Sequence, residues 1–164
     1  MIHIRRIAPT EWLVAKRLVY RVAQATFNDP RPLEEIIAHF DALGTLNDML
    51  DIQAHYFESG GIFLVMFDGD EMICTGAVRS LGRDVCELKR LWLLPEYHGQ
   101  GLGYRMTQEL LAFARAQGYQ RMRLETDPAS QSRAVAFYEQ LGFKQIPFEN
   151  GKPDEEDILM EMTL

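Results

Sequence analysis

The sequence predicts an α/β protein of the α+β type, with a central, mostly antiparallel mixed sheet of about seven strands and flanking helices. Two patterns predict it. Three β-rich segments between residues 62 and 94 are separated only by short turns, which is typical of an antiparallel meander. A glycine-rich turn and an amphipathic helix then lead to a further strand, which is typical of a parallel crossover. The length of 164 residues suits one domain with a sizeable core.

The first 60 residues are expected to form one strand and several helices. Residues 2–7 alternate in polarity and predict a strand. A helix is expected to begin with Thr10 as its N-cap, and a second helix is expected over about 32–40. The segment 45–57 is compatible with a further helix or with a loop. The apolar face of the first helix is expected to contain Leu13, Val14, Leu18 and Val22.

The meander is expected to consist of strands 62–67, 71–81 and 85–94. Asp68-Gly69-Asp70 suits the first turn, because an Asp-Gly pair tolerates the positive φ of tight hairpins. Gly76, inside the middle strand, indicates a bulge or a close approach of another element.

The rest of the chain is expected to alternate between strands and helices. A helix from Leu102 to Gln117 is closed by Gly118, and a second helix begins at Ser130 or Ser132 and is closed by Gly142. The expected strands are 120–126, which should run parallel to 85–94, then 143–147 and 158–164, with a loop at 150–153 and an acidic run at 154–157 before the last.

Composition narrows the classes of function. The net charge of −7 argues against non-specific nucleic-acid binding. Residues 87–144 carry eight Lys and Arg against six Asp and Glu, so the remainder is strongly acidic. A polyanionic cofactor would suit the first part and a cationic substrate the second, although ordinary solvated charge explains the same asymmetry. With no apolar run of membrane-spanning length and no apolar leader at the start, we expect a cytoplasmic protein without a membrane partner.

Cysteines and histidines point to no metal site. Cys74 and Cys86 lie in strand-like runs and are expected to be buried free thiols. The four histidines, His3, His39, His55 and His98, are scattered, and no Cys/His spacing resembles a metal-binding motif.

A loop with three glycines leads into the helix that begins at Leu102. Free backbone amides at a helix N-terminus attract a phosphate, and glycine lets a ligand approach the backbone closely. The loop is not a dinucleotide fingerprint, because Tyr104 stands where the third glycine would be, and it lacks the Lys-Ser/Thr pair of a P-loop. The glycines alone are equally compatible with a tight turn that binds nothing.

Three segments in order, LPEYHGQGLGYRM, LET and AVAFYEQLGF, closely resemble the GCN5-related N-acetyltransferase (GNAT) family. The resemblance covers residues 61–164, whereas residues 8–58 match only in being helical. The resemblance implies a single domain over residues 1–164, in which 8–58 form the variable helical region on the acceptor side. His98 departs from the Arg or Gln that the family usually has. The resemblance also implies a bulge near Leu93, which would splay strand 85–94 from strand 120–126 and let acetyl-CoA enter the wedge.

The resemblance implies acetyl-CoA as cosubstrate and no metal. The backbone of the third meander strand would bind the pantetheine arm, the glycine loop would wrap the pyrophosphate, and Gln131 would stand where the family commonly has an Asn that touches the cofactor. The residues concerned are Leu91, Trp92 and Leu93 for the arm, and Gly99, Gln100, Gly101, Leu102, Gly103 and Tyr104 for the pyrophosphate.

Acetyl transfer to an amine needs a base, because an alkyl ammonium has a pKa of about 10. Glu87 and Glu125 are the candidates, and for each the alternative is an ion-paired or surface carboxylate. We favour Glu87, whose pKa an apolar wall containing Trp92 or Tyr97 could raise. Tyr138 matches the family's general acid, which returns a proton to the leaving thiolate; the alternative is a packing tyrosine. A strand amide near Leu93 is the expected donor to the oxyanion.

Three functions remain open at this stage. The chain could acetylate a primary amine of a small molecule, or an N-terminal amine or lysine of a protein, or it could bind acyl-CoA as a sensor without catalysis. A small-molecule acceptor is favoured, since the acidic N-terminal third suits an amine. The resemblance also allows a homodimer.

Overall fold

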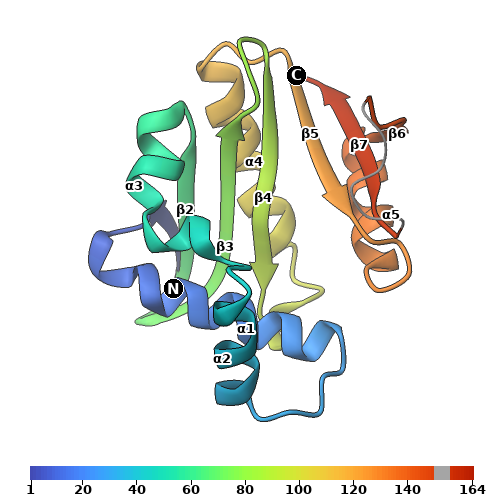
Figure 1. Cartoon of the computed structure of the whole chain (residues 1–164). Helices are drawn as coiled ribbons and strands as arrows, with labels where there is room; N and C mark the ends of the chain where they lie inside the picture. Colours follow the sequence, from blue (N-terminus) through green and yellow to red (C-terminus); the bar gives the residue numbers. More distant parts are fainter. Residues whose placement is uncertain (150–155) are drawn as a thin grey trace.

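The computed structural model describes residues 1–149 and 156–164, which form a seven-stranded mixed sheet with flanking helices (Figure 1). The strand order is β1-β2-β3-β4-β5-β7-β6; all neighbours are antiparallel except β4 and β5, which run parallel. The predicted fold class is therefore confirmed. The strands are β1 (Ile2–Arg6), β2 (Ile62–Asp68), β3 (Glu71–Ser80), β4 (Val85–Leu93), β5 (Arg121–Thr126), β6 (Lys144–Ile146) and β7 (Ile158–Thr163).

Helices cover both faces of the sheet. α1 (Trp12–Thr26), α2 (Leu33–Ala42) and α3 (Ile52–His55) lie in front of it in Figure 1, while α4 (Leu102–Ala116) lies behind. α5 (Ser132–Leu141) lies beside β7. A continuous core of buried apolar side chains joins the sheet to α1 and α4.

The start of the first helix differs from the prediction. Pro9–Glu11 form a short 3-10 helix (η1), so Thr10 is not an N-cap and α1 begins at Trp12. The Glu11 carboxylate instead accepts a hydrogen bond from the Ala8 amide at 2.9 Å and pairs with Arg5. A side chain three residues downstream thus satisfies the first free amide, as in a capping box.

The buried face of α1 is also rotated from the predicted one. Leu13 and Val14 are 70% and 53% exposed, whereas Leu18 and Val22 are buried as expected. The core-facing side is completed by Ala15, Val19 and Tyr20. Residues 45–57, for which the sequence allowed either a helix or a loop, contain short helical turns. The 3-10 helices η2 (Asn47–Leu50) and η3 (Phe57–Ser59) lie on either side of α3 in the sequence.

The meander follows the prediction closely. Gly69 turns the β2–β3 hairpin with a φ of +60°. Gly76 marks both features that its position indicated: the β3–β4 register shifts there, and a Cβ on Gly76 would lie 2.9 Å from Leu110 Cδ1 and 3.0 Å from Met106 Cγ on α4. The absence of a side chain lets α4 pack directly on β3.

The helices and strands predicted after the meander are confirmed. Gly118 and Gly142, with φ of +89° and +111°, follow α4 and α5 as expected. α5 begins at Ser132, one of the two expected starts, and Gln131 is its N-cap. The expected loop at 150–153 and the start of the acidic run, 154–155, lie outside the described residues.

Cys74 and Cys86 are buried free thiols, as predicted. Within 1–149 and 156–164, no group of His, Cys, Asp and Glu side chains is arranged to hold a metal ion. In the same residues no helix is long and apolar enough to cross a membrane.

Candidate active site

A β-bulge interrupts β4 at Arg90 and Leu91. The register passes from Thr75 opposite Trp92 to Ala77 opposite Lys89, so two residues of β4 face Gly76 alone. Arg90 has a left-handed φ of +55°, and the Thr75 hydroxyl donates to its carbonyl at 2.7 Å. The resemblance placed this bulge near Leu93; it lies two to three residues earlier.

The side chain of Arg90 ties the bulge to the helical N-terminal region. Its Nε and Nη2 donate to the Asp48 carboxylate at 3.0 and 2.7 Å, and Tyr56 donates to the same carboxylate. Both partners of the ion pair are 17% exposed. Burial opposes the charge of Asp48, but the Arg90 hydrogen bonds and charge prevail and lower its pKa. The pair therefore holds a backbone conformation that costs a non-glycine residue about 1–2 kcal/mol.

The parallel strands β4 and β5 diverge after a short contact. Their register extends only from Val85–Glu87 to Arg121–Met122–Arg123. Beyond it β5 continues to pair with β7, as far as Thr126 opposite Ile158, while the facing edge of β4 has no partner on β5. A wedge therefore opens between the two strands, as the resemblance implied.

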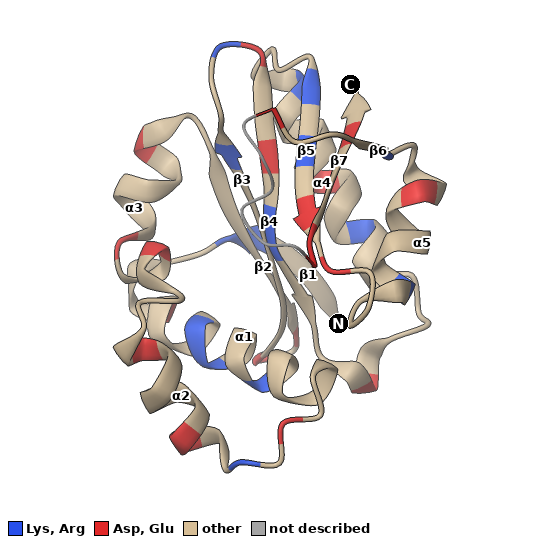
Figure 2. Cartoon of the chain, turned by 45° about the vertical axis from the view of Figure 1, so that its right-hand side comes forward, with Lys and Arg blue, Asp and Glu red and all other residues tan. Residues whose placement is uncertain are grey.

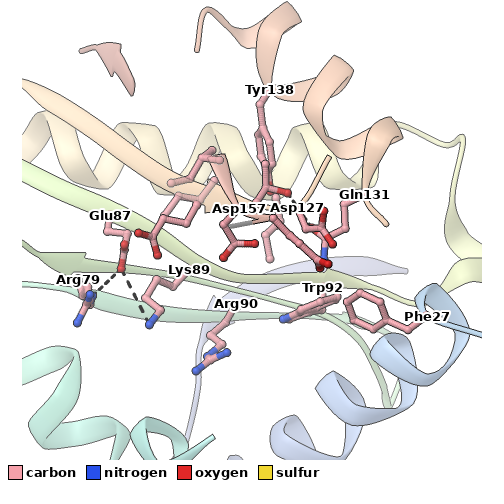
Figure 3. A pocket seen from close by; sticks show the side chains of 16 residues that line it. Phe27, Arg79, Glu87, Lys89, Arg90, Trp92, Asp127, Gln131, Tyr138 and Asp157 are labelled. Atoms are coloured by element: carbon pink, nitrogen blue, oxygen red, sulfur yellow. Dashed lines mark hydrogen bonds and ion pairs between the residues drawn. The ribbon is translucent and has the colours of Figure 1, made fainter. Parts of the chain in front are cut away.

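A cavity of about 430 Å³ lies at this wedge (Figure 3). Both strands that border it carry acidic and basic side chains: Glu87 precedes Lys89 and Arg90 on β4, and Arg121 and Arg123 precede Glu125 on β5 (Figure 2). The volume is within the range of about 300–1,000 Å³ that is usual for small-molecule sites. The lining residues are Phe27, Arg79, Glu87, Leu88, Lys89, Arg90, Leu91, Trp92, Leu124, Glu125, Thr126, Asp127, Gln131, Tyr138, Glu156 and Asp157.

Glu87, the favoured base, is ion-paired rather than set against an apolar wall. Its side chain is 9% exposed, and its Oε1 lies 2.6 Å from Arg79 Nε and 4.0 Å from Lys89 Nζ (Figure 3). Arg79 faces Glu87 through the β3–β4 register. Trp92 lines the same cavity, but Tyr97 does not; its hydroxyl donates to Asp68 instead. Of the two aromatic residues expected beside Glu87, only Trp92 shares its cavity, and the choice between Glu87 and Glu125 as base stays a prediction.

Glu125, the other candidate, has the electrostatic setting of a base. Burial and the negative charges of Glu87 and Asp157 raise its pKa, against the opposing charges of Lys89 and Arg79. No described residue forms a hydrogen bond or an ion pair with its carboxylate. A raised pKa brings a carboxylate closer to the range in which it exchanges protons near neutrality.

Tyr138 reaches from α5 into the cavity (Figure 3). Its ring packs on Phe143 with centroids 5.7 Å apart. Burial raises the pKa of its phenol, so the group stays protonated at neutral pH. No side chain or carbonyl in the described part of the chain accepts a hydrogen bond from this hydroxyl, which leaves it available to a ligand.

The glycine loop presents amides without acceptors. In the described residues, no backbone hydrogen bond has an amide of residues 99–104 as its donor. A Cβ on Gly99, Gly101 or Gly103 would meet no atom within 4 Å, so the space above the loop is open. The loop also leads into the N-terminus of α4. These free amides and the helix dipole suit a pyrophosphate, so the site fits the expected cosubstrate.

Other expected cofactor contacts are distributed unevenly. Leu91, Trp92 and Gln131 line the cavity, whereas Leu93 does not. His98, which departs from the family pattern, lies with Nε2 3.0 Å from the Leu93 carbonyl and so ties the loop to β4. The Gln131 side chain accepts a hydrogen bond from Thr126 at 2.9 Å. Whether these residues touch a cofactor stays a prediction.

Sequence reasoning missed several lining residues. Lys89 shares the face of Glu87 because the two are two positions apart in a strand, which the alternation alone could have shown. The consecutive charges of Lys89 and Arg90 break the alternation of β4 and could have indicated the bulge. No local sequence pattern predicts that Phe27 lines the cavity. It lies at the C-terminal end of α1, far in the sequence from the β4 and β5 residues that it joins there.

Comparison with known families decides the classification of this fold and site. The model of the acetyltransferase (GNAT) family matches residues 15–143. The chain belongs to the GNAT family. The match includes the bulged strand, the glycine loop and the helix that carries Tyr138.

Curated GNAT relatives match over part of their length. The "Uncharacterized N-acetyltransferase YjgM" of Escherichia coli (strain K12) is 32% identical over 99 residues, which are 58% of this chain and 59% of that protein. N-acetyltransferase 8F1 of Mus musculus is 36% identical over 104 residues, 60% of this chain and 46% of that protein. The chain thus matches less than two thirds of the length of these relatives.

Solved GNAT structures share the whole fold. An acetyltransferase from Streptococcus agalactiae 2603 superposes with a TM-score of 0.81 at 21% identity, covering 99% of this chain and 98% of that one. The PaiA N-acetyltransferase from Thermoplasma acidophilum, solved in complex with coenzyme A, gives a TM-score of 0.78 at 21% identity over 100% and 99% of the two chains. At this identity the likeness shows the fold.

Proposed function

We propose that this GNAT protein transfers an acetyl group from acetyl-CoA to a primary amine of a small molecule, by direct transfer in a ternary complex. The observation that supports it most is the cavity at the β4–β5 wedge, where an open strand edge, Tyr138 and Glu125 meet. The free amides of residues 99–104 supply an anion site at the end of the same strand. The relative solved with coenzyme A and the N-acetyltransferase relatives support the same reaction class.

Acetyl-CoA, when bound, supplies a thioester whose carbonyl carbon accepts the amine and whose sulfur departs as a thiol. Glu125 takes the proton that the acceptor's ammonium group must lose before the free amine can attack. A backbone amide of β4 after the bulge, near Leu93, donates to the carbonyl oxygen as negative charge develops there. Tyr138, kept protonated by its raised pKa, gives its proton to the sulfur and regains one from solvent.

Glu87 takes a supporting part in this proposal. Its carboxylate is held by Arg79 at 2.6 Å, so it is less free to accept a proton. Its negative charge instead contributes to the raised pKa of Glu125. Glu87 remains the alternative base if the Arg79 contact opens when an acceptor binds.

The reaction is tested by measuring free CoA thiol released from acetyl-CoA in the presence of a panel of amines. The panel contains amino acids, aliphatic and aromatic monoamines, polyamines and peptides with free N-termini. We expect acceptor-dependent release with small amines, because the cavity has the volume of a small-molecule site. Release with peptides alone would favour a protein N-acetyltransferase. Thermal stabilisation by CoA without release would leave an acyl-CoA-binding domain.

A further inference from the structure

Most charged side chains that line the cavity have a hydrogen-bond or ion-pair partner, or another contact, within the chain. Arg79 pairs with Glu87 at 2.6 Å, and Arg90 pairs with Asp48 at 2.7 Å. Asp127 accepts a hydrogen bond from Ser130 at 2.7 Å. The remaining carboxylates near the C-terminal strand, Glu156 and Asp157, are also engaged.

Two lining side chains of opposite charge are left, Lys89 and Glu125. Lys89 Nζ forms only a long ion pair with Glu87, at 4.0 Å, and the same Oε1 binds Arg79 at 2.6 Å; the charge of Asp48 also acts on Lys89. No described side chain donates to Glu125. Lys89 is 27% exposed, and burial together with the charge of Arg90 lowers its pKa. A cation in this setting gains from an anionic partner.

Lys89 and Glu125 face the same cavity without pairing with each other. They stand on β4 and β5, which diverge at this level. The charge of Lys89 nevertheless acts on Glu125, since it opposes the rise of that carboxyl's pKa. A cavity with a weakly paired positive group on one wall and an unpaired carboxylate on the other is complementary to a molecule that carries both charges.

We propose that the acceptor is a zwitterion of the amino-acid type, in which a carboxylate beside the amine binds Lys89 while the amine faces Glu125. This assignment rests on the proposed acetyl transfer and narrows its acceptor. A polyamine lacks the carboxylate that would bind Lys89 and is therefore expected to be the poorer acceptor. The amine loses its proton to Glu125, and the carboxylate takes no part in bond formation.

The test compares acceptors that differ only in the carboxylate. kcat/KM is measured for L-phenylalanine against phenethylamine and for L-leucine against isoamylamine, with rates expressed per unprotonated amine. One charge-assisted hydrogen bond predicts a preference of about tenfold or more for the amino acid in the wild-type protein. In Lys89→Gln we expect the ratio to fall close to one, and in Lys89→Arg most of it to return.

Lys144→Gln is the matched control. Lys144 is exposed on β6 and does not line the cavity, so this variant removes the same charge from the molecule without touching the site. We expect its ratio to equal the wild-type ratio. Equal effects of Lys144→Gln and Lys89→Gln would show that net charge, not a contact, sets the preference, and would overturn the proposal.

A second measurement does not depend on turnover. Trp92 lines the cavity, and in a Trp12→Phe background it is the sole tryptophan, so its fluorescence reports binding. With CoA present, N-acetyl-L-phenylalanine should bind about tenfold more tightly than N-acetylphenethylamine, and Lys89→Gln should remove the difference. Acetyl transfer without any carboxylate preference would overturn this inference alone. No transfer to any acceptor, with no binding of either product, would overturn the proposed function as well.

Discussion

Replacing Asp48 by Asn is expected to disturb the β4 bulge and to lower acetyl transfer by more than the loss of stability explains. Asp48 is the only described carboxylate that binds Arg90, with contacts of 3.0 and 2.7 Å. Asparagine keeps the size of the side chain but loses the charge and one acceptor. Arg90 then retains a partly buried charge without a counterion, at a position whose φ is +55°.

The magnitude follows from the burial of the pair. Removing one partner of a fully buried ion pair costs about 3–5 kcal/mol, and an exposed pair contributes about 0.2–1 kcal/mol. Since both side chains are 17% exposed, we expect the free energy of unfolding to fall by about 2 kcal/mol. The effect on kcat/KM should be about 10- to 100-fold, because a shift of about 1 Å at a reacting centre can cost 10²-fold.

Chemical denaturation and steady-state kinetics on the folded variants measure the two effects. Glu161→Gln is the control: Arg123 and Glu161 pair at 2.7 Å with side chains 17% and 18% exposed, and neither side chain lines the cavity. Because Arg123 keeps Glu149 as a partner at 3.2 Å, we expect Glu161→Gln to destabilise the fold less than Asp48→Asn and to leave kcat/KM nearly unchanged. If Asp48→Asn keeps wild-type kcat/KM, or if both variants lose it equally, the bulge does not position the thioester and the reasoning fails.

Three further predictions concern single side chains. Tyr138→Phe should lower kcat by about 10²- to 10⁴-fold while CoA still stabilises the fold in thermal melts; unchanged turnover would remove the phenol from the mechanism. Glu125 has a raised pKa, so kcat/KM should fall as the pH drops through that value, and Glu125→Gln should lower kcat/KM and abolish this acidic limb in a pH profile. Gly61→Ala should lower the free energy of unfolding by about 3 kcal/mol or more in urea melts, because its Cβ would lie 2.0 Å from the Val78 carbonyl oxygen. The control Gly69→Ala, whose Cβ would lie in open space, should cost only the strain of its positive φ, about 1–2 kcal/mol. Equal losses in the two variants would contradict this prediction.

The fold was predictable because its signals are local. Alternation and the Asp-Gly turn defined the meander, and glycines with positive φ marked the ends of α4 and α5. The failures at the N-terminus are physical. Thr10 has the chemistry of a cap, but the first helical turn begins earlier, at Pro9. Ala8 is therefore the N-cap, and its amide donates to the Glu11 carboxylate. Leu13 and Val14 fit an apolar stripe by spacing, but the position of α1 on the sheet buries the face of Ala15 instead.

The site was only partly predictable because its chemistry depends on register and on distant segments. Tyr138 could be picked out from the sequence because its motif has the same spacing as in the family it resembles. In the structure its side chain lines the cavity. The partner of Glu87 depends on which β3 residue lies opposite, and only the structure supplies that register. Arg90 binds Asp48 across 42 positions of sequence, and no local pattern encodes that contact.

A structure of the protein with acetyl-CoA would decide whether the β4–β5 wedge is the cosubstrate site. We expect the pyrophosphate on the amides of residues 99–104, the pantetheine arm along the open edge of β4, and the sulfur within hydrogen-bond distance of the Tyr138 hydroxyl, about 3–4 Å. The thioester would then face the cavity that Glu125 and Lys89 share. A cosubstrate bound outside the β4–β5 wedge, or a sulfur beyond the reach of Tyr138, would contradict it.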